Sequence, residues 1–297
     1  MRVVPSELYT NLLAELQTDQ QNENQAVLEA SSGQSVNTLS DNPVAAGQLV
    51  LDRAQIDDVD QFSYSVSTVQ GSMNAASSAL NSVVSSLTQA VSVGTEAAGG
   101  TLSSSELQAL GQQMSQIEQQ VVGLANTTYQ GSYLFSGTAV TTQAYTLNSS
   151  TGAVTYNGND DSNQVQVGED QTATLNLPGS SIFNASGADV FQSLANLTSA
   201  INSGNSTSIG TAVASVQTAL NNVSCQQSVY DTWLQQLGTD STNLSQEKVT
   251  LQQNQTSLIG ADEAQVATNL SQAETTLQAA IAAAGQVSQD SLLNYLK

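Results

Sequence analysis

The sequence contains no histidine and a single cysteine, Cys225, so two of the commonest groups of catalytic and metal sites are nearly absent. Without histidine, neither a Ser-His-Asp or Cys-His triad nor a zinc site of mixed His and Cys ligands can be built. One cysteine also allows no disulfide within the chain. These absences exclude most hydrolase and metalloenzyme chemistry, and we predict no catalytic, metal-binding or cofactor-binding residues.

Basic residues are scarce as well. Four Lys and Arg stand against 25 Asp and Glu, which gives a formal net charge of -21, although only 10% of the 297 residues are charged. Because such a chain repels phosphate backbones, nucleic acid is not an expected partner. Few charges would remain once the carboxylates are protonated, below their ordinary pKa values of about 3.9 and 4.3. We therefore predict that the protein tolerates an acidic exterior.

Long apolar runs are missing too. The run from Ala279 to Ala284 is far shorter than the ~20 residues that cross a bilayer, so membrane insertion is not expected. Near the start of the chain, polar residues separate Leu8, Leu12 and Leu16. No cleavable signal peptide is recognised there.

Helical periodicity is the main positive signal. Apolar residues recur at spacings of three and four over 62–90, 107–124 and 209–258. This pattern predicts three long helices with heptad character. Four polar residues interrupt the third repeat at core positions and can fix its register: Gln227, Ser241, Lys248 and Gln255.

Glycine and serine mark the expected helix boundaries. Gly94, Gly99 and Gly100 are expected to break the first helix. Ser103–Ser105 with Glu106 can cap the start of the second helix.

The two chain ends carry weaker helical patterns. The first, from Val4 to Leu28, has a polar middle, and the second, from Val266 to Val287, uses small side chains. Alone, neither buries enough apolar surface to offset its ordering entropy. We predict that the two segments pair with each other or with copies of the chain.

Short alternating runs distinguish residues 136–190. Asn148–Gly152, Asn157-Gly158 and Pro178-Gly179 supply turn residues between them. The predicted strands are Tyr145–Leu147, Val154–Tyr156, Val165–Val167 and Thr172–Leu177.

The fold class expected is mainly α: a long antiparallel helical hairpin or coiled-coil bundle with paired N- and C-terminal helices and a small β-rich insert at the distal tip. Residues 1–40 and 260–297 would be terminal coiled-coil assembly segments. Residues 41–135 and 191–259 would form a helical bundle domain, and residues 136–190 a small β-rich outer domain.

Several conspicuous residues favour structural roles. Asp160, Asp161, Glu169 and Asp170 lack the spacing of an EF-hand calcium loop, so solvated turns are the better interpretation. Glu106 and Glu118 are twelve residues apart, about 18 Å along a helix and too far for a glycosidase pair. We expect a solvated or half-buried thiol at Cys225 and a partly buried packing residue at Trp233.

Residues 29–47 carry a Ser32-Gly33 turn, Asn37 and an Asp41-x-Pro43 helix start, and they resemble the N-terminal signature of the flagellin superfamily. The physical chemistry agrees, since Gly33 can take a positive φ, and Asp41 or Asn42 can cap a helix begun by Pro43. The family usually places Lys or Arg after the turn, where this chain has Gln34 and Ser35.

Three further segments are similar to the hook-filament junction proteins of the FlgL type within that superfamily: Leu124–Thr127, Gly131–Gly137 and the ending Val287–Leu296. The resemblance implies a structural subunit and no enzyme, exported without cleavage through the flagellar type III apparatus to the extracellular flagellum. It also implies several partners, namely a ring of copies of the chain itself, the hook-side hook-associated protein, flagellin and a flagellar export chaperone.

The assembly contacts are expected on the terminal helices. The residues that we nominate are Leu8, Leu12, Leu16, Leu270, Leu277, Ile281, Leu292, Leu293, Tyr295 and Leu296. Two alternatives stay open: a flagellin-like filament subunit, and a surface adhesin that carries its β insert on a helical stalk.

Overall fold

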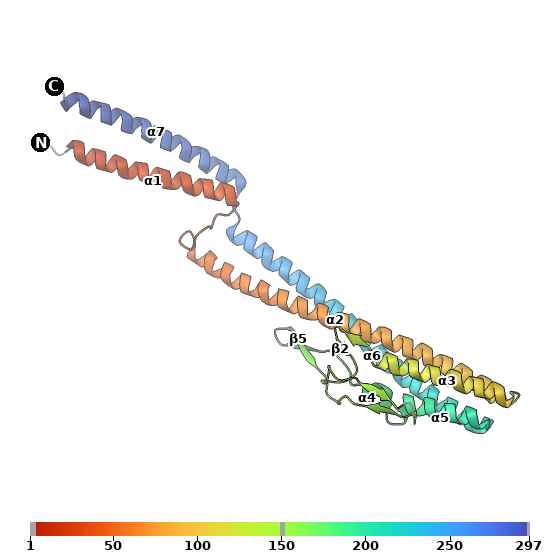
Figure 1. The fold of residues 1–297 in the computed structure, drawn as a ribbon. Coiled ribbons are helices and arrows are strands. Elements are labelled where there is room, and N and C mark those ends of the chain that lie inside the picture. The colour runs from red at the N-terminus through yellow and green to blue at the C-terminus, as the bar shows by residue number, and fades with distance from the viewer. Residues whose placement is uncertain (1–3, 149–151, 296–297) are drawn as a thin grey trace. The chain divides into compact units, whose positions relative to one another are not determined.

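The computed structural model describes residues 4–148 and 152–295, and long helices make up most of them (Figure 1). The chain forms two compact units. Unit 1 comprises Met1–Asp58 and Glu247–Lys297, and unit 2 comprises Val59–Gln246. Helices α2 (Pro43–Ala98) and α6 (Ser206–Ile259) run through both units. The expected mainly α fold of long paired helices with a small β-rich region is confirmed.

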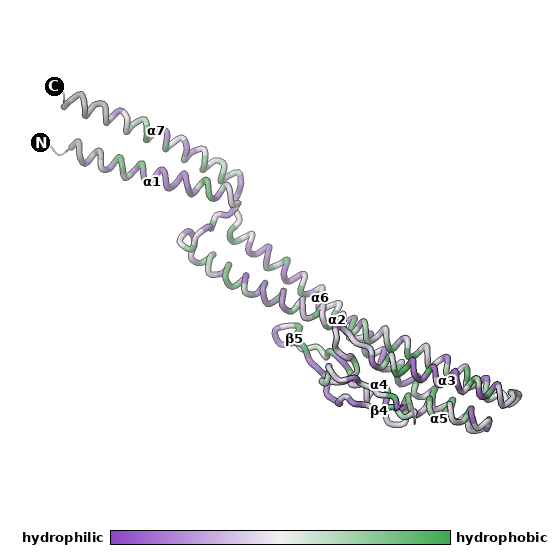
Figure 2. The backbone as a smooth tube through the Cα atoms, viewed as in Figure 1, coloured by the Kyte–Doolittle hydropathy of each residue, from purple (hydrophilic) through white to green (hydrophobic). Residues whose placement is uncertain are grey.

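Unit 1 brings the two ends of the described chain together. Helix α1 (Val4–Ser32) and helix α7 (Glu263–Tyr295) lie side by side and run in opposite directions (Figure 1). The predicted pairing of the terminal segments with each other is therefore confirmed. Figure 2 shows apolar residues interspersed with hydrophilic ones on both helices, and the apolar side chains that are buried include Ala26 on α1 and Val266 on α7.

Unit 2 is a helical bundle. The remainder of α2 packs with α3 (Ser104–Ala125), α5 (Val190–Ser203) and part of α6 (Figure 1). Residues of the predicted heptad repeats are fully buried, among them Val69, Leu80, Val83, Leu87, Met114, Val121, Val216 and Val223. The periodicity thus identified the core correctly.

Helix α3 begins as its sequence predicts. The Ser103 Oγ accepts the Glu106 N–H, and the Glu106 carboxylate accepts the Ser103 N–H at 2.6 Å, which completes a capping box. Gly100 lies in the turn before it with φ of +70°. The end of α2 at Ala98 and the start of α3 at Ser104 therefore lie where the glycines and serines predict them.

The expectation that Gly94 breaks α2 was wrong, because the helix continues through it to Ala98. A Cβ atom at Gly94 would lie 2.5 Å from Cγ2 of Val213 and 3.1 Å from Cδ1 of Leu197. Glycine allows α2 to pack closely against α5 and α6 at this position. Its low helix propensity costs some stability but does not end the helix.

The β-rich region consists of short antiparallel pairs. β1 (Thr128–Tyr129) pairs with β2 (Ser132–Tyr133), and β3 (Tyr145–Leu147) with β4 (Val154–Tyr156). β5 (Gln164–Gly168) pairs with β6 (Gln171–Thr174), and β7 (Asn184–Ala185) with β8 (Ala188–Asp189). The short helix α4 (Gly179–Phe183) precedes β7.

The predicted last strand is shorter than expected, because β6 ends at Thr174 and not at Leu177. Beyond it the backbone has other partners. The Asn176 side chain accepts the Asn163 N–H at 3.0 Å, and the Leu177 N–H donates to the Tyr230 hydroxyl at 2.9 Å. The segment is thereby tied to α6 instead of to a neighbouring strand.

An aromatic cluster joins this region to the bundle. The Tyr145 ring lies 5.5 Å from the Phe183 ring and 4.9 Å from the Phe191 ring, centroid to centroid. Asn126, at the end of α3, accepts the Tyr145 N–H and donates to the Tyr145 carbonyl, both at 2.8 Å. Burial raises the pKa of the Tyr145 hydroxyl well above its ordinary value.

Candidate assembly segments

A backbone clasp at Gly33 joins the two chain segments of unit 1. Gly33 takes φ of +66°, a conformation that costs glycine little, and its N–H donates to the Glu29 carbonyl at 2.9 Å. Its carbonyl accepts the Ala261 N–H at 3.0 Å, while the Ser35 N–H donates to the Ile259 carbonyl at 2.7 Å. The positive φ expected at Gly33 is confirmed, and the hydrogen bond of its carbonyl connects the end of α1 to the turn between α6 and α7.

The loop after the clasp is held by Asp41. Its carboxylate accepts the Thr38 N–H at 2.8 Å, the Thr38 hydroxyl at 2.8 Å and the Asn37 N–H at 2.9 Å. These hydrogen bonds, those from Thr38 first, lower the pKa of the Asp41 carboxyl below its ordinary value. The side chain of Asn37 donates to the Gln34 carbonyl at 2.9 Å.

Asn42 is the residue that caps α2. Its side-chain oxygen accepts the Ala45 N–H at 3.1 Å, and the helix begins at Pro43. The sequence allowed either Asp41 or Asn42 as the cap of α2. Asn42 takes that role, and Asp41 holds the preceding loop.

A small apolar core lies beneath this loop. Val36, Ala45, Ala46 and Ile259 are buried together, and Leu49 and Leu258 pack against them. The five residues of the sequence signature, Ser32, Gly33, Asn37, Asp41 and Pro43, thus surround one compact crossover between the chain segments of unit 1.

The nominated leucines of the terminal helices are incompletely covered. Leu12, Leu16, Leu270 and Leu277 are half-buried, and Ile281 is 54% exposed. The side chains of Leu8, Leu292, Leu293 and Tyr295, and all of Leu296, lie outside what the structure describes.

Exposed apolar side chains concentrate in unit 1. Among residues whose exposure the structure describes, Tyr64 is the one large exposed apolar side chain in unit 2. Those of unit 1 are Leu13, Val27, Leu28, Leu39, Val44, Val50, Leu51, Val249 and Ile281. Unit 1 therefore presents the kind of surface that another chain can cover.

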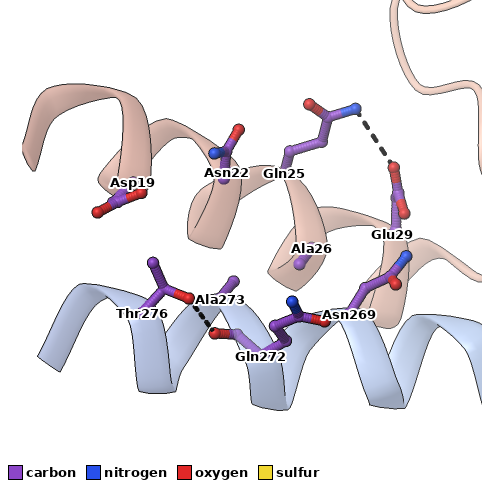
Figure 3. Close-up of a pocket in the computed structure, with 9 residues that line it drawn as sticks. All are labelled: Asp19, Asn22, Gln25, Ala26, Glu29, Asn269, Gln272, Ala273 and Thr276. Atoms are coloured by element: carbon purple, nitrogen blue, oxygen red, sulfur yellow. Dashed lines mark hydrogen bonds between the residues drawn. The ribbon is translucent and has the colours of Figure 1, made fainter. Parts of the chain in front are cut away.

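A polar pocket of about 390 Å³ opens between α1 and α7 (Figure 3). Its lining comprises Asp19, Asn22, Gln25, Ala26 and Glu29 from α1 with Asn269, Gln272, Ala273 and Thr276 from α7. Asp19 is only 9% exposed, yet in the described part of the chain it makes no hydrogen bond or ion pair. Asp19 is not among the residues nominated from the sequence, although it continues the spacing of Leu12 and Leu16.

Three other residues singled out in the sequence, Trp233, Cys225 and Asp160, lie outside this pocket. Trp233 is half-buried and its ring packs edge-on against Tyr230, with 5.7 Å between centroids, as a packing residue should. Cys225 is exposed. Asp160 accepts a hydrogen bond from the Ser180 hydroxyl at 2.6 Å.

The described residues contain neither a candidate membrane span nor a candidate metal cluster. Over 4–148 and 152–295, no helix has the length and apolar character needed to cross a membrane. In the same residues, no three His, Cys, Asp or Glu side chains gather as they would around a metal ion.

Two family models match most of the chain. The bacterial flagellin N-terminal helical region matches residues 6–140, and the bacterial flagellin C-terminal helical region matches residues 213–296. The chain belongs to the flagellin family. No curated protein sequence matches this flagellin-family member.

Solved structures share its fold. A Vibrio parahaemolyticus protein described as a flagellar hook-associated protein has a TM-score of 0.68 at 20% identity, over 73% of this chain and 99% of that chain. FlgL of Bacillus cereus has a TM-score of 0.61 at 22% identity, over 69% and 99%. The flagellar junction protein FlgL of Legionella pneumophila has a TM-score of 0.61 at 15% identity, over 72% and 100%. At these identities the likeness establishes a common fold.

Proposed function

We propose that this flagellin-family chain is a structural subunit of the bacterial flagellum that joins the hook to the flagellin filament. The observation that carries the proposal is the concentration of exposed apolar side chains in unit 1, whereas the bundle of unit 2 buries its own. The fold likeness to proteins described as hook-associated or junction proteins supports the junction over the filament itself.

The terminal segments, residues 1–40 and 260–297, are the assembly segments of the subunit. Helices α1 and α7 leave Leu13, Val27, Leu28 and Ile281 between 45% and 54% exposed. Full burial of such a side chain contributes about 1.5–3 kcal/mol relative to full exposure. Covering them with copies of the chain would supply the stabilisation that the isolated pair of helices lacks.

The partners in this proposal are a ring of copies of the chain, the hook-side hook-associated protein, flagellin, and a chaperone for export to the extracellular flagellum. Leu12, Leu16, Leu270 and Leu277 would complete their burial in those contacts. In this proposal the subunit performs no catalysis and needs no cofactor, because its role is structural.

Immunogold electron microscopy tests the placement. Antibody against unit 2, applied to isolated hook-filament complexes, should label a single band where the hook meets the filament. Label spread along the filament would instead support the filament-subunit alternative. Label confined to the cell surface, away from flagella, would support the adhesin alternative.

A further inference from the structure

The Asp19 pocket between α1 and α7 contains a carboxylate without a partner. Asp19 is 9% exposed, and the described residues supply it with no hydrogen bond and no ion pair. Burying a charged group is costly unless it is paired and hydrogen-bonded. The pocket beside it, of about 390 Å³, leaves room for a long side chain to enter and pair with it (Figure 3).

The rest of the pocket lining suits a planar cation. Asn22, Gln25, Asn269 and Gln272 line the pocket with amide groups, and Thr276 adds a hydroxyl (Figure 3). The Gln25 amide already donates to Glu29, the Asn269 amide oxygen accepts from Gln265, and the Thr276 hydroxyl donates to the Gln272 carbonyl, which leaves the amide oxygens of Asn22, Gln25 and Gln272 as acceptors. A guanidinium has five N–H donors, so it can pair with one carboxylate and still donate to amide oxygens. A single ammonium would satisfy fewer of these acceptors.

Few cations are available to a chain with four basic residues. Arg2 and Lys297 lie outside the described residues, and Lys248 already has an interaction partner. Arg53 is exposed on α2, and in the described part of the chain it makes no ion pair or hydrogen bond. Val50, one turn earlier on the same face of α2, is 61% exposed, so an arginine and an apolar side chain form one surface patch.

We propose that Arg53 of one copy enters the Asp19 pocket of a neighbouring copy in the ring, with Val50 covered at the rim. This inference rests on the proposed junction function and adds the residues of its subunit contact. The contact is heterologous, since it joins two different surface patches, and heterologous contacts are the kind that generate rings. It pairs a buried unpartnered carboxylate with an exposed unpartnered guanidinium.

Charge exchange between the two residues tests the contact. Cells that make only Asp19→Arg or only Arg53→Glu should secrete the subunit at normal levels yet lose their filaments and leak flagellin. The double variant, with both changes in one chain, should restore filaments, because every ring contact then joins an arginine and a carboxylate again. Double-variant cells that stay without filaments would overturn the pairing, as would single variants with normal filaments.

Matched controls separate the contact from folding. Glu7 is exposed on the same helix, twelve residues before Asp19, and Glu7→Arg makes a charge change of the same sign too far away to pair with Asp19, so it should leave filaments intact. Circular dichroism of each purified variant should match that of the parent chain. Asp19→Asn, which keeps the shape and removes the charge, should give an intermediate loss of filaments, and a fully normal result would count against the ion pair.

Cross-linking gives a second, direct readout. In a Cys225→Ser background, Asp19→Cys and Arg53→Cys together should give linked chains when isolated hook-filament complexes are treated with a bis-maleimide whose spacer replaces the length of the arginine side chain, and either cysteine alone should not. A direct disulfide would not reach, because it needs Cα atoms within about 7 Å. Chains that stay monomeric after bis-maleimide treatment of the assembled junction would overturn the contact. Failure of this inference alone leaves the immunogold band unchanged, whereas failure of the junction proposal removes the band itself.

Discussion

Two glutamates of helix α3 should respond to neutralisation in opposite directions. Glu118 is 7% exposed, and its Oε1 is buried without a hydrogen-bond partner. Burial raises the pKa of the Glu118 carboxyl above its ordinary value. Glu106 lies in the capping box, and the hydrogen bonds from Ser103 lower the pKa of its carboxyl. Glu118→Gln should therefore stabilise the folded protein at pH 7, and Glu106→Gln should destabilise it.

The size of the Glu118 effect follows from its surroundings. Leaving a buried polar group unsatisfied costs about 1–3 kcal/mol, and more when the group is charged. Glutamine keeps the shape and removes the charge, so we expect a gain of about 1–2 kcal/mol at pH 7. For a unit of this length each kcal/mol shifts the midpoint by about 2–4 °C, which gives a rise of about 2–8 °C.

The two glutamates should also differ in how their effects on stability depend on pH. Because the folded pKa of Glu118 is raised, its ionised form destabilises the protein at neutral pH. This cost fades as the pH falls through the raised pKa and is gone below the unfolded value of about 4.3. The lowered pKa of Glu106 means that its contribution is present above the unfolded value. That contribution is lost as the pH falls through its lower folded pKa.

Thermal unfolding followed by circular dichroism at pH 7 and pH 4 measures both effects. Glu118→Gln should raise the midpoint at pH 7 by several degrees and change it little at pH 4. A midpoint that falls at pH 7, or rises equally at both pH values, would refute the assignment of a desolvated carboxylate. Glu106→Gln serves as the matched variant on the same helix.

Four shorter predictions concern packing, helix propensity, capping and charge. Gly94→Ala adds a Cβ that meets Val213, and this overpacking costs about 1–3 kcal/mol, of which about 1 kcal/mol is regained in helix propensity. Urea titration should show the net loss of stability. Gly210→Ala, with nothing within 4 Å of its Cβ, should stabilise by about 0.5–1 kcal/mol in the same assay. Asn42→Ala removes the cap of α2 and should lower stability by about 1 kcal/mol in the same titration, whereas no loss would show that another group caps the helix. Far-UV circular dichroism at pH 3 should retain most of the helix signal, and loss of helicity there would contradict the predicted acid tolerance.

Periodic burial made most of the fold predictable. A heptad repeat specifies which face of a helix is buried, and the residues of unit 2 from Val69 to Leu87 obey it. Gly94 shows the limit of local rules, since glycine both weakens helices and permits close packing, and only the tertiary neighbours decide between the two. Likewise, adjacent Asp41 and Asn42 are equally good caps until the loop before them is known.

The smallest strands and the pocket carried weaker signals. β1 and β2 have two residues each, too few to alternate, and their turn depends on positive φ values at Gln130 and Gly131. Asp19 occupies a core position of the helical repeat within a segment that is otherwise polar. The sequence therefore gives its position on the helix face but does not predict that it is buried. Burial there depends on α7, which lies at the other end of the sequence.

Deletion of the gene for this chain tests the proposal that the chain joins the filament to the hook. Electron microscopy of the deleted cells should show complete hooks without filaments, and a blot of the medium should show secreted flagellin. Filaments that persist unchanged would contradict the account. Loss of the filament with no flagellin outside the cell would contradict it as well, and would identify the chain as the filament subunit.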